Sequence, residues 1–311
     1  MRSVTRKIET LRRAVAEARL RMKPETLAKL LENDLPKKDV FAVARAAGVL
    51  AAKKTAELIP YCHPVPIDWV EVTFRVESSE VAVQAAVEAV AKTGVEMEAL
   101  TAASIAALTV YDMLKPVDAE IEILSTKLLQ KTGGKSDFIE KIPPGFKAAV
   151  IVTSDSTSQG KRRDKSGQII LERLRAIGIE AEYLILPDDK VMIAASLVDL
   201  CEKRFRLVMT TGGTGLGPRD LTAEATAGII EREIPGIMEA ARSFGQRRTP
   251  YSMLSRGVAG RRGNTLIVNL PGSSKGVEES LDAVFPAILH AFKMMRGAGH
   301  EISPVKNGNK P

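Results

Sequence analysis

Cysteine is scarce in this sequence, and its scarcity excludes two kinds of architecture. Cys62 and Cys201 are the only cysteines among 311 residues, and they lie far apart without metal-ligand spacing. A disulfide framework and a structural zinc site are therefore not indicated. Two ordinary thiols favour a reducing compartment, so we expect a cytoplasmic protein.

Long hydrophobic runs are also lacking. No uninterrupted apolar stretch reaches the roughly 20 residues that a membrane-spanning helix needs. The first residues, MRSVTRKIETLRR, carry too many charges for a secretory signal. We therefore expect no membrane partner.

Aromatic residues make up only 4% of the sequence, although the net charge is +7. Proteins that bind single-stranded nucleic acid combine basic grooves with aromatic side chains on which bases stack. No basic run here contains interleaved aromatics, so no nucleic-acid partner is expected. The basic residues lie instead beside glycine turns, in KTGGKS, GKRRDKSG and PGSSKG, which favours small polyanionic substrates.

The first half of the chain combines helical and strand periodicity. Residues 5–58 are predicted to be helical, because Leu11, Val15, Ala18 and Met22 recur at helical spacing. A second helix is expected from Pro24, and a third over about 40–58.

Strands are predicted further along this half. Alternation over 70–76 and the segment VAVQAAV predict two strands, followed by a long helix over about 95–114 and a short strand around EIEIL. The expected class is α+β, a ferredoxin-like antiparallel sheet with helices on one face.

Periodicity is lost between Lys131 and Pro144, which marks a domain boundary. Beyond it, the apolar runs KAAVIVT, AEYLILP, RLVMTT and NTLIVNLP alternate with amphipathic segments. This rhythm predicts an α/β domain with a doubly wound, mostly parallel sheet. We expect domains at 1–138 and 147–300, a linker at 139–146 and a flexible tail at 301–311.

Unusual turns follow the predicted parallel strands, where ligands bind in such sheets. The turn TTGGTGLGPRDLT contains glycines that let backbone N–H groups approach a phosphate closely. Asp220 ends this turn and Asp188 follows a neighbouring strand. Mg²⁺ is usually held by one or two carboxylates plus substrate phosphates. The alternative is that Asp188 begins a turn and Asp220 caps the next helix.

The chain from about 146 to 295 resembles the molybdopterin adenylyltransferases, the MogA/MoaB family that includes the gephyrin G domain. SDS, LPDD, TTGGTGLGPRDLTAEAT, TPYSMLSR and LIVNLPGSSKG carry the resemblance. It implies a nucleotidyltransferase that moves AMP from its substrate ATP to molybdopterin with Mg²⁺ and releases pyrophosphate.

By this resemblance Asp188 and Asp220 are catalytic and hold the metal. The implied substrate-binding residues are Ser154, Asp155, Gly212, Gly213, Thr214, Gly215, Pro271, Gly272 and Ser273. Two alternatives stay open: a molybdopterin-binding or scaffold module without this activity, and a MoaB-like domain of weak activity.

In the first half, Asp112 and Lys115 are spaced to share one helix face and to form an acid–base pair. A surface ion pair is the alternative. On an unbroken helix Glu96 and Asp112 would lie roughly 24 Å apart, too far for one small-molecule site. If both residues belong to the site, either the helix breaks or two protomers share the site, and we expect a site shared between protomers.

Residues from about 4 to 138 resemble the MoaC family, the cyclic pyranopterin monophosphate synthases. RMKPETLAKL, KKDVFAVARAAGVLAAKKT, LIPYCHP and KTGVEMEALTAASIAALTVYDMLK carry the resemblance. It implies a lyase that converts 3',8-cyclo-7,8-dihydro-GTP to cyclic pyranopterin monophosphate and pyrophosphate. Asp112 and Lys115 are then the acid–base pair. The implied substrate-binding residues are Lys37, Lys53, His63, Glu96, Met97, Glu98 and Lys131.

Together the two resemblances imply a bifunctional enzyme of molybdenum cofactor biosynthesis. Its partners are pterin and nucleotide substrates, and its expected assembly is a homo-oligomer, either a trimer or a hexamer. This sequence departs from the MoaC pattern at Ser3, where aspartate is common, and in GGKSDF, which lacks a glycine before the aspartate.

Overall fold

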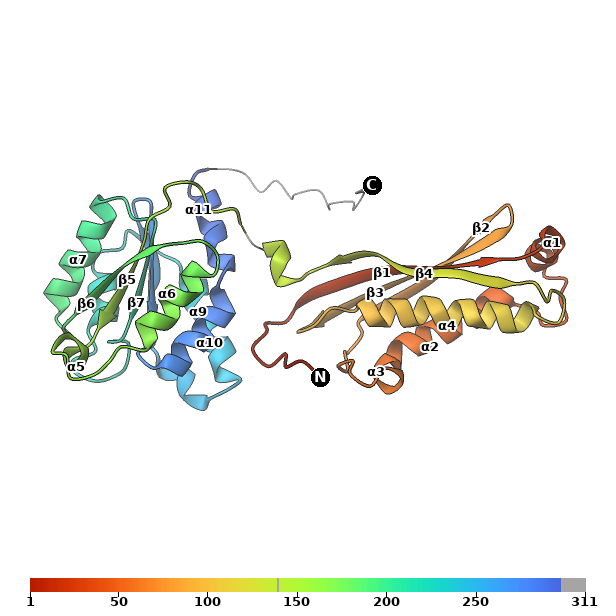
Figure 1. Cartoon of the computed structure of the whole chain (residues 1–311). Helices are drawn as coiled ribbons and strands as arrows, with labels where there is room; N and C mark the ends of the chain where they lie inside the picture. Colours follow the sequence, from red (N-terminus) through yellow and green to blue (C-terminus); the bar gives the residue numbers. More distant parts are fainter. Residues whose placement is uncertain (139, 298–311) are drawn as a thin grey trace. The chain divides into compact units, whose positions relative to one another are not determined.

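The computed structural model describes residues 1–138 and 140–297, which form two compact units divided between Asp137 and Phe138 (Figure 1). The tail expected at 301–311 lies outside the described residues. Each unit has its own sheet and its own hydrophobic core.

The first unit is built on a four-stranded antiparallel sheet. Its strands are β1 (Thr10–Arg21), β2 (Trp69–Glu77), β3 (Glu80–Ala91) and β4 (Glu122–Thr132). They lie in the order β2-β3-β1-β4, and all the pairings are antiparallel. This is the strand order of the ferredoxin-like fold, so the α+β prediction is confirmed.

The helix predicted at the start of the chain is wrong, because residues 10–21 form β1, one of the two inner strands of the sheet. Ala14, Ala16, Ala18 and Leu20 are completely buried at every second position, which is the period of a strand. β1 pairs with β3 along one edge and with β4 along the other. These two ladders override the helix propensity of an alanine-rich segment, since local propensity is a weak prior.

Four helices complete the unit: α1 (Pro24–Glu32), α2 (Val40–Lys53), α3 (Thr55–Leu58) and α4 (Glu96–Leu114). Helices α2, α3 and α4 pack together on one face of the sheet, and α1 lies at the end of the strands (Figure 1). The helix predicted over 40–58 is interrupted at Lys54 and continues as the single turn α3. The long helix predicted over 95–114 is present as the unbroken helix α4.

Helix α4 packs against the sheet and α2 through small side chains. Its completely buried residues include Ala99, Ala102, Ala103, Ala106 and Ala107. Among the described helices, α4 alone is long and apolar enough to cross a membrane, but half of its apolar stretch is buried inside the protein. That burial is the environment of a core helix.

The second unit is a six-stranded sheet in the order β6-β5-β7-β10-β9-β8. Four neighbouring strands are parallel: β5 (Ala148–Thr153), β6 (Ala181–Leu186), β7 (Leu207–Thr211) and β10 (Thr265–Leu270). Two antiparallel strands continue the sheet beyond β10 and were not predicted: β9 (Ala259–Arg262) and, at the edge, β8 (Arg232–Glu233).

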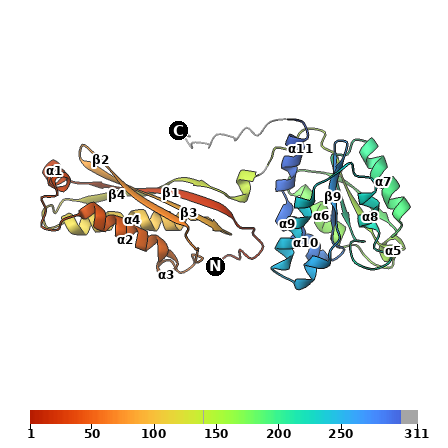
Figure 2. The same ribbon diagram turned by 180° about the vertical axis from the view of Figure 1, so that it is seen from behind.

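Helices cover both faces of this sheet (Figure 2). One core lies beneath α6 (Ser166–Arg175), α9 (Pro235–Gln246) and α10 (Ser274–Val284). A second core lies beneath α7 (Lys190–Glu202) and α8 (Thr222–Ala227). The doubly wound prediction is therefore confirmed.

The short elements are α5 (Asp155–Ser158), α11 (Ala291–Met294), and the 3₁₀ turns η1 (Lys135–Phe138), η2 (Pro250–Leu254) and η3 (Ala287–His290).

The strand order positions a binding crevice. From β5 the chain continues to β6 on one side, and it then returns to form β7 on the other side of β5. In open parallel sheets, ligands bind beyond the carboxyl ends of the strands at such a reversal. The ends of β5 and β7 are therefore the place to look for a site.

The close packing of α2 on α4 can be tested at Gly48. A Cβ atom there would lie 3.1 Å from the Ala102 carbonyl oxygen and 3.2 Å from the Ala106 Cβ. We expect Gly48→Val to destabilise the first unit by about 1–3 kcal/mol, because overpacking forces the helices apart. Trp69, the only tryptophan, lies in β2, so its fluorescence during urea unfolding reports on this unit alone.

The matched control is Ala46→Val, an exposed position on the same helix, which carries only the propensity cost of about 0.5 kcal/mol. Equal stability losses in the two variants would contradict the close packing.

Candidate functional sites

A cavity of about 380 Å³ lies where four strands of the second unit end. Seven of the residues predicted from sequence line it together: Ser154, Asp188, Gly212, Gly213, Asp220, Gly272 and Ser273. They come from the segments that follow β5, β6, β7 and β10. The motifs are far apart in sequence and meet because the carboxyl ends of parallel strands share one edge.

The glycines of this cavity are required by close backbone packing. A Cβ atom on Gly212 would lie 2.2 Å from the Thr153 carbonyl oxygen, and one on Gly213 would lie 2.2 Å from Thr222 Oγ1. Both glycines also have positive φ angles, of 100° and 60°. A Cβ atom on Gly272 would lie 3.2 Å from the Gly212 Cα. Three strand ends therefore come together in a form that side chains would prevent.

Asp188 and Asp155 hold the ends of β6 and β5 together. The Asp155 N–H donates to Asp188 Oδ2, and the Asp188 N–H donates to Asp155 Oδ1, both at 3.1 Å. Burial raises the pKa of Asp188, and the nearby carboxylates Asp155 and Asp220 raise it further. Asp155 also forms an ion pair with Arg219. Asp155 does not line the cavity itself, but it holds Asp188, which does.

Neither metal-binding candidate acts as a helix cap. Asp220 Oδ2 accepts a hydrogen bond from the Gly217 N–H at 2.8 Å, inside its own turn, and the residue at the N-cap of α8 is Leu221. Asp189 caps α7 by accepting from the Met192 N–H. The capping alternative for Asp220 is therefore wrong, and both Asp188 and Asp220 line the cavity.

The carboxylates of this cavity suit a metal ion whose remaining ligands come from the substrate. Over residues 1–138 and 140–297, no group of three or more His, Cys, Asp or Glu residues is placed to hold a metal ion. Two carboxylates with substrate oxygens completing the shell are a usual arrangement for Mg²⁺. Asp188 and Asp220 fit that arrangement.

The predicted residues Thr214, Gly215 and Pro271 support the cavity without lining it. The Pro271 carbonyl accepts from Thr211 Oγ1 at 2.7 Å, and Thr214 is buried. The Gly215 carbonyl accepts from Arg256 Nε at 2.6 Å. Arg256 also donates to the Asp220 carbonyl and pairs with Glu224, so it holds the glycine turn in place. Arg256 was not among the predicted site residues, although it ends the recognised motif TPYSMLSR.

Sequence reasoning also missed a cationic loop of this cavity. Arg162, Arg163, Asp164 and Lys165 line it beside the predicted residues. The motif GKRRDKSG was noted as a basic cluster beside glycine turns, and that was the available signal. On the other side, Ser273 caps α10 by accepting from the Gly276 N–H at 3.1 Å.

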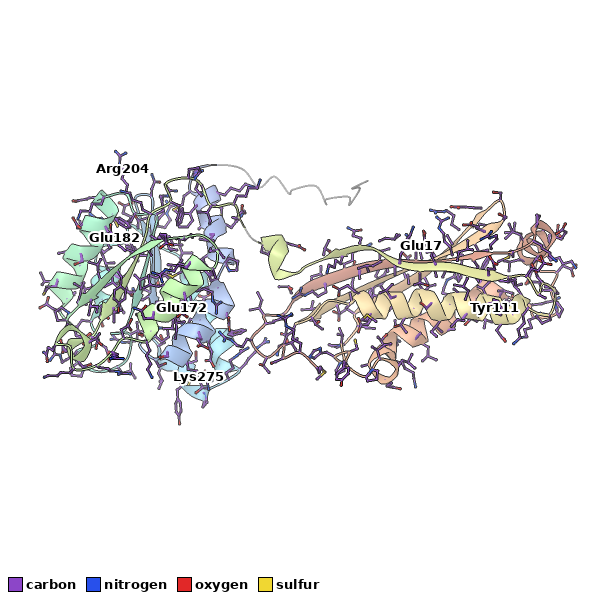
Figure 3. The ribbon with its side chains drawn as sticks, in the orientation of Figure 1. Glu17, Tyr111, Glu172, Glu182, Arg204 and Lys275 are labelled. Atoms are coloured by element: carbon purple, nitrogen blue, oxygen red, sulfur yellow. The ribbon has the colours of Figure 1, made fainter. Side chains whose placement is uncertain are left out.

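In the first unit, Asp112 lies between two lysines near the C-terminal end of α4. Lys115 Nζ lies 2.7 Å from Asp112 Oδ1, and Lys37 Nζ lies 2.8 Å from Asp112 Oδ2. Hydrogen bonds from Lys115 and then from Lys37 lower the pKa of Asp112 to about 2. Asp112 in turn raises the pKa of Lys115. At neutral pH the carboxylate is ionised and the lysine carries the proton. Tyr111, labelled in Figure 3, marks this end of α4.

The other predicted group lies at the N-terminal end of α4. Glu96 Oε1 lies 3.3 Å from Lys131 Nζ, and both residues line a cleft of about 350 Å³. Arg12 and Arg13 line the same cleft and were not predicted. Arg12 is buried and donates from Nε to the Ala91 carbonyl. This cleft has the cationic lining that a polyphosphate requires.

Glu98 is buried one residue beyond Met97, which is exposed. The Cys62 thiol donates to Glu98 Oε1 at 3.6 Å, while Glu98 Oε2 has no hydrogen-bond partner in the part of the chain described. Burial raises the pKa of Glu98. Burial and then Glu98 raise the pKa of Cys62 to about 11. The predicted residue His63 directly follows this thiol and is half-buried.

One chain does not bring all the predicted residues of this unit together. Helix α4 runs unbroken from Glu96 to Leu114, so Glu96 and Asp112 lie roughly 24 Å apart at about 1.5 Å per residue. Lys131 belongs to the Glu96 group and Lys37 to the Asp112 group. The predicted residue Lys53 ends α2 and is exposed.

The contact between Cys62 and Glu98 can be tested by the pH dependence of thiol alkylation. In a Cys201→Ser background, we expect the alkylation rate of Cys62 to keep rising through pH 10, because only the thiolate reacts. Glu98→Gln removes the neighbouring negative charge and is expected to lower the pKa of Cys62, although burial keeps it above its ordinary value. Glu71→Gln, at an exposed position on β2, is the control. An identical profile in Glu98→Gln and the control would contradict the contact.

Comparisons with known proteins match both units. Residues 1–134 match the MoaC family, and residues 149–290 match the family described as "Probable molybdopterin binding domain". The cyclic pyranopterin monophosphate synthase of Roseiflexus sp. is 51% identical over 142 residues, which cover 45% of this chain and 90% of that protein. The solved structure of MoaB from Thermus thermophilus is 44% identical, covers 49% of this chain and 97% of that chain, and has a TM-score of 0.46.

Two relatives match across both units. The molybdenum cofactor biosynthesis bifunctional protein of Chlorobaculum tepidum is 44% identical over 301 residues, which cover 96% of each chain. The protein of the same description from Synechococcus elongatus is 38% identical over 309 residues, with 94% of this chain and 97% of that protein covered. With its MoaC domain followed by a MogA/MoaB-like domain, this chain belongs to the family of bifunctional molybdenum cofactor biosynthesis proteins.

Proposed function

We propose that the first unit converts 3',8-cyclo-7,8-dihydro-GTP to cyclic pyranopterin monophosphate and pyrophosphate, and that the second adenylylates molybdopterin with ATP and Mg²⁺. The observation that carries the proposal is that the predicted charged residues of each unit lie close together at a surface that a substrate can reach. Those places are the ends of α4 and the carboxyl ends of the parallel strands. The proposed location is the cytoplasm.

In the first unit, the proton lies on Lys115. Asp112 holds this ammonium group at 2.7 Å and is a weak base, because its pKa is about 2. Lys115 is therefore the proton donor of the pair, and Asp112 positions it. After Lys115 has donated its proton, its neutral amine beside Asp112 can act as the base that accepts one. Lys37 holds the other oxygen of Asp112 at 2.8 Å, and its ammonium group is proposed to contact the triphosphate from there.

In the second unit, the proposed reaction is attack by the terminal phosphate of molybdopterin on the α-phosphorus of ATP, with pyrophosphate leaving. Mg²⁺, held by Asp188 and Asp220, would neutralise charge on the phosphate oxygens. The turn at Gly212 and Gly213 allows close approach of the triphosphate to the backbone. The N-terminus of α10, which Ser273 caps, favours a phosphate nearby. Positioning and charge neutralisation are thus the contributions of this chain.

The proposed site of the first unit is built by two copies of the chain. The distance along α4 supports this, because the Glu96 cleft and the Asp112 group lie too far apart for one small substrate in a single chain. A second copy could place its Asp112 group beside the Glu96 cleft of the first. The proposed assembly is a homo-oligomer with the threefold character of a trimer or a hexamer.

A second candidate for the C-terminal unit is binding of molybdopterin without chemistry. The matched family is described as a molybdopterin-binding domain, which names binding alone and favours this candidate. The position of Asp188 and Asp220 in one cavity favours adenylylation, because simple binding of an anionic pterin gains nothing from two carboxylates.

The two activities are expected to be lost separately. Asp112→Asn should reduce formation of the cyclic monophosphate by on the order of 100-fold or more, because Lys115 loses the charge that positions it. Asp220→Asn should reduce release of pyrophosphate from ATP with molybdopterin by a similar factor, because a metal ligand is lost. Each variant is assayed for both reactions, so each serves as the folding control of the other. Loss of both activities in either variant would contradict two independent sites, and no adenylylation in the unaltered chain would favour simple binding.

A further inference from the structure

The loop at 161–165 contains four cations around one acid. Arg162, Arg163 and Lys165 line the same cavity as Asp188 and Asp220, whereas Lys161 does not line it. The side chains of all four cations are exposed. The loop therefore brings a concentrated positive charge to the mouth of the proposed adenylyl-transfer site.

The acid in this loop, Asp164, is already fully engaged by local hydrogen bonds. Its Oδ1 accepts from the Gly167 N–H and from Ser166 Oγ, both at 3.0 Å. Its Oδ2 accepts from the Tyr183 hydroxyl at 2.7 Å and from the Gln168 N–H at 3.2 Å. Asp164 thus fastens the loop to α6 and β6, and its oxygens are not available to pair with the neighbouring arginines.

The other end of the loop is held by its backbone. The N–H groups of Lys161 and Arg162 donate to the Ser156 carbonyl, at 2.9 and 3.1 Å. The backbone is therefore fixed on both sides of Arg162 and Arg163. Among the described residues, neither arginine has a carboxylate partner, and nor does Lys165. Unpaired cations carried on a held backbone at a cavity wall favour an anionic ligand.

We propose that Arg162 and Arg163 bind phosphate oxygens of a polyanionic substrate in this cavity. The planar guanidinium group suits this task, because it offers two parallel N–H donors to a phosphate. The inference rests on the proposed adenylyl transfer and adds two residues to that site. Two phosphate groups fit the chemistry: the β- and γ-phosphates of ATP, which leave as pyrophosphate, and the terminal phosphate of the pterin.

The charges in the cavity support this assignment. Three cations and three acids line the cavity. Of the acids, Asp164 is held by local hydrogen bonds, and Asp188 and Asp220 are the proposed metal ligands. Once a divalent cation neutralises those two acids, the three cations outnumber the one remaining acid of the cavity, Asp164. Phosphate oxygens are the ligand chemistry that would balance them.

The test is calorimetric binding to the full-length chain that carries both Arg162→Gln and Arg163→Gln. The probes are pyrophosphate, AMP, and ATP with Mg²⁺. We expect pyrophosphate and ATP to bind about 10-fold or more weakly, because charge-assisted hydrogen bonds are lost, with AMP unchanged. Lys161→Gln removes one positive charge from the same loop outside the cavity, and this variant should bind all three probes normally. An unchanged thermal unfolding temperature establishes that the variants are folded.

Binding of molybdopterin separates the two sources of phosphate. If the double variant binds ATP and pyrophosphate normally but molybdopterin about 10-fold more weakly, the arginines hold the pterin phosphate and the inference stands. If all four ligands bind the double variant as they bind the unaltered chain, the inference is wrong and the proposed function survives. If the unaltered chain binds neither ATP nor molybdopterin, both the inference and the proposed function fail.

Discussion

The unbroken length of α4 is the constraint on which the first unit depends. A stripe of completely buried alanines lets α4 lie close to the sheet and to Gly48 of α2. This packing holds Glu96 at one end of the helix and Asp112 near the other. The same feature that stabilises the fold therefore divides the predicted catalytic and substrate-binding residues into two groups.

Each group has its own electrostatic character. Around Asp112 two lysines hold a carboxylate in its ionised form, so that Lys115 keeps its proton. Around Glu96, Arg12 and Lys131 line a cleft suited to a polyphosphate. If two copies of the chain associate, the Asp112 group of one copy can lie beside the Glu96 cleft of the other. This is the reason for proposing a shared site.

In the second unit, the predicted site residues lie together within one chain. A doubly wound sheet brings the ends of β5, β6, β7 and β10 to one edge, and glycines let those ends approach closely. Asp188 and Asp220 consequently line one cavity although they lie in separate motifs. Residues of a single chain therefore line this cavity.

The sequence allowed both fold classes and most strand-end residues to be predicted, because turns after buried strands carry distinctive glycines and acids. It misassigned β1, since Leu11, Val15, Ala18 and Met22 also recur at helical spacing, and the strands that pair with β1 lie far away in sequence. β8 and β9 are too short to show a period. Arg12, Arg162 and Arg163 were missed because only the folded chain brings these cations to a cavity wall.

The shared site in the first unit is tested most directly by mixed oligomers. Chains carrying Glu96→Gln and chains carrying Asp112→Asn, each with a different affinity tag, are co-expressed and purified through both tags in succession. Each variant alone is expected to be inactive in forming the cyclic monophosphate, whereas the mixed oligomer should regain activity, because one of its sites combines an intact Glu96 with an intact Asp112 from the other chain. A doubly tagged oligomer as inactive as its parents would contradict a site built by two copies.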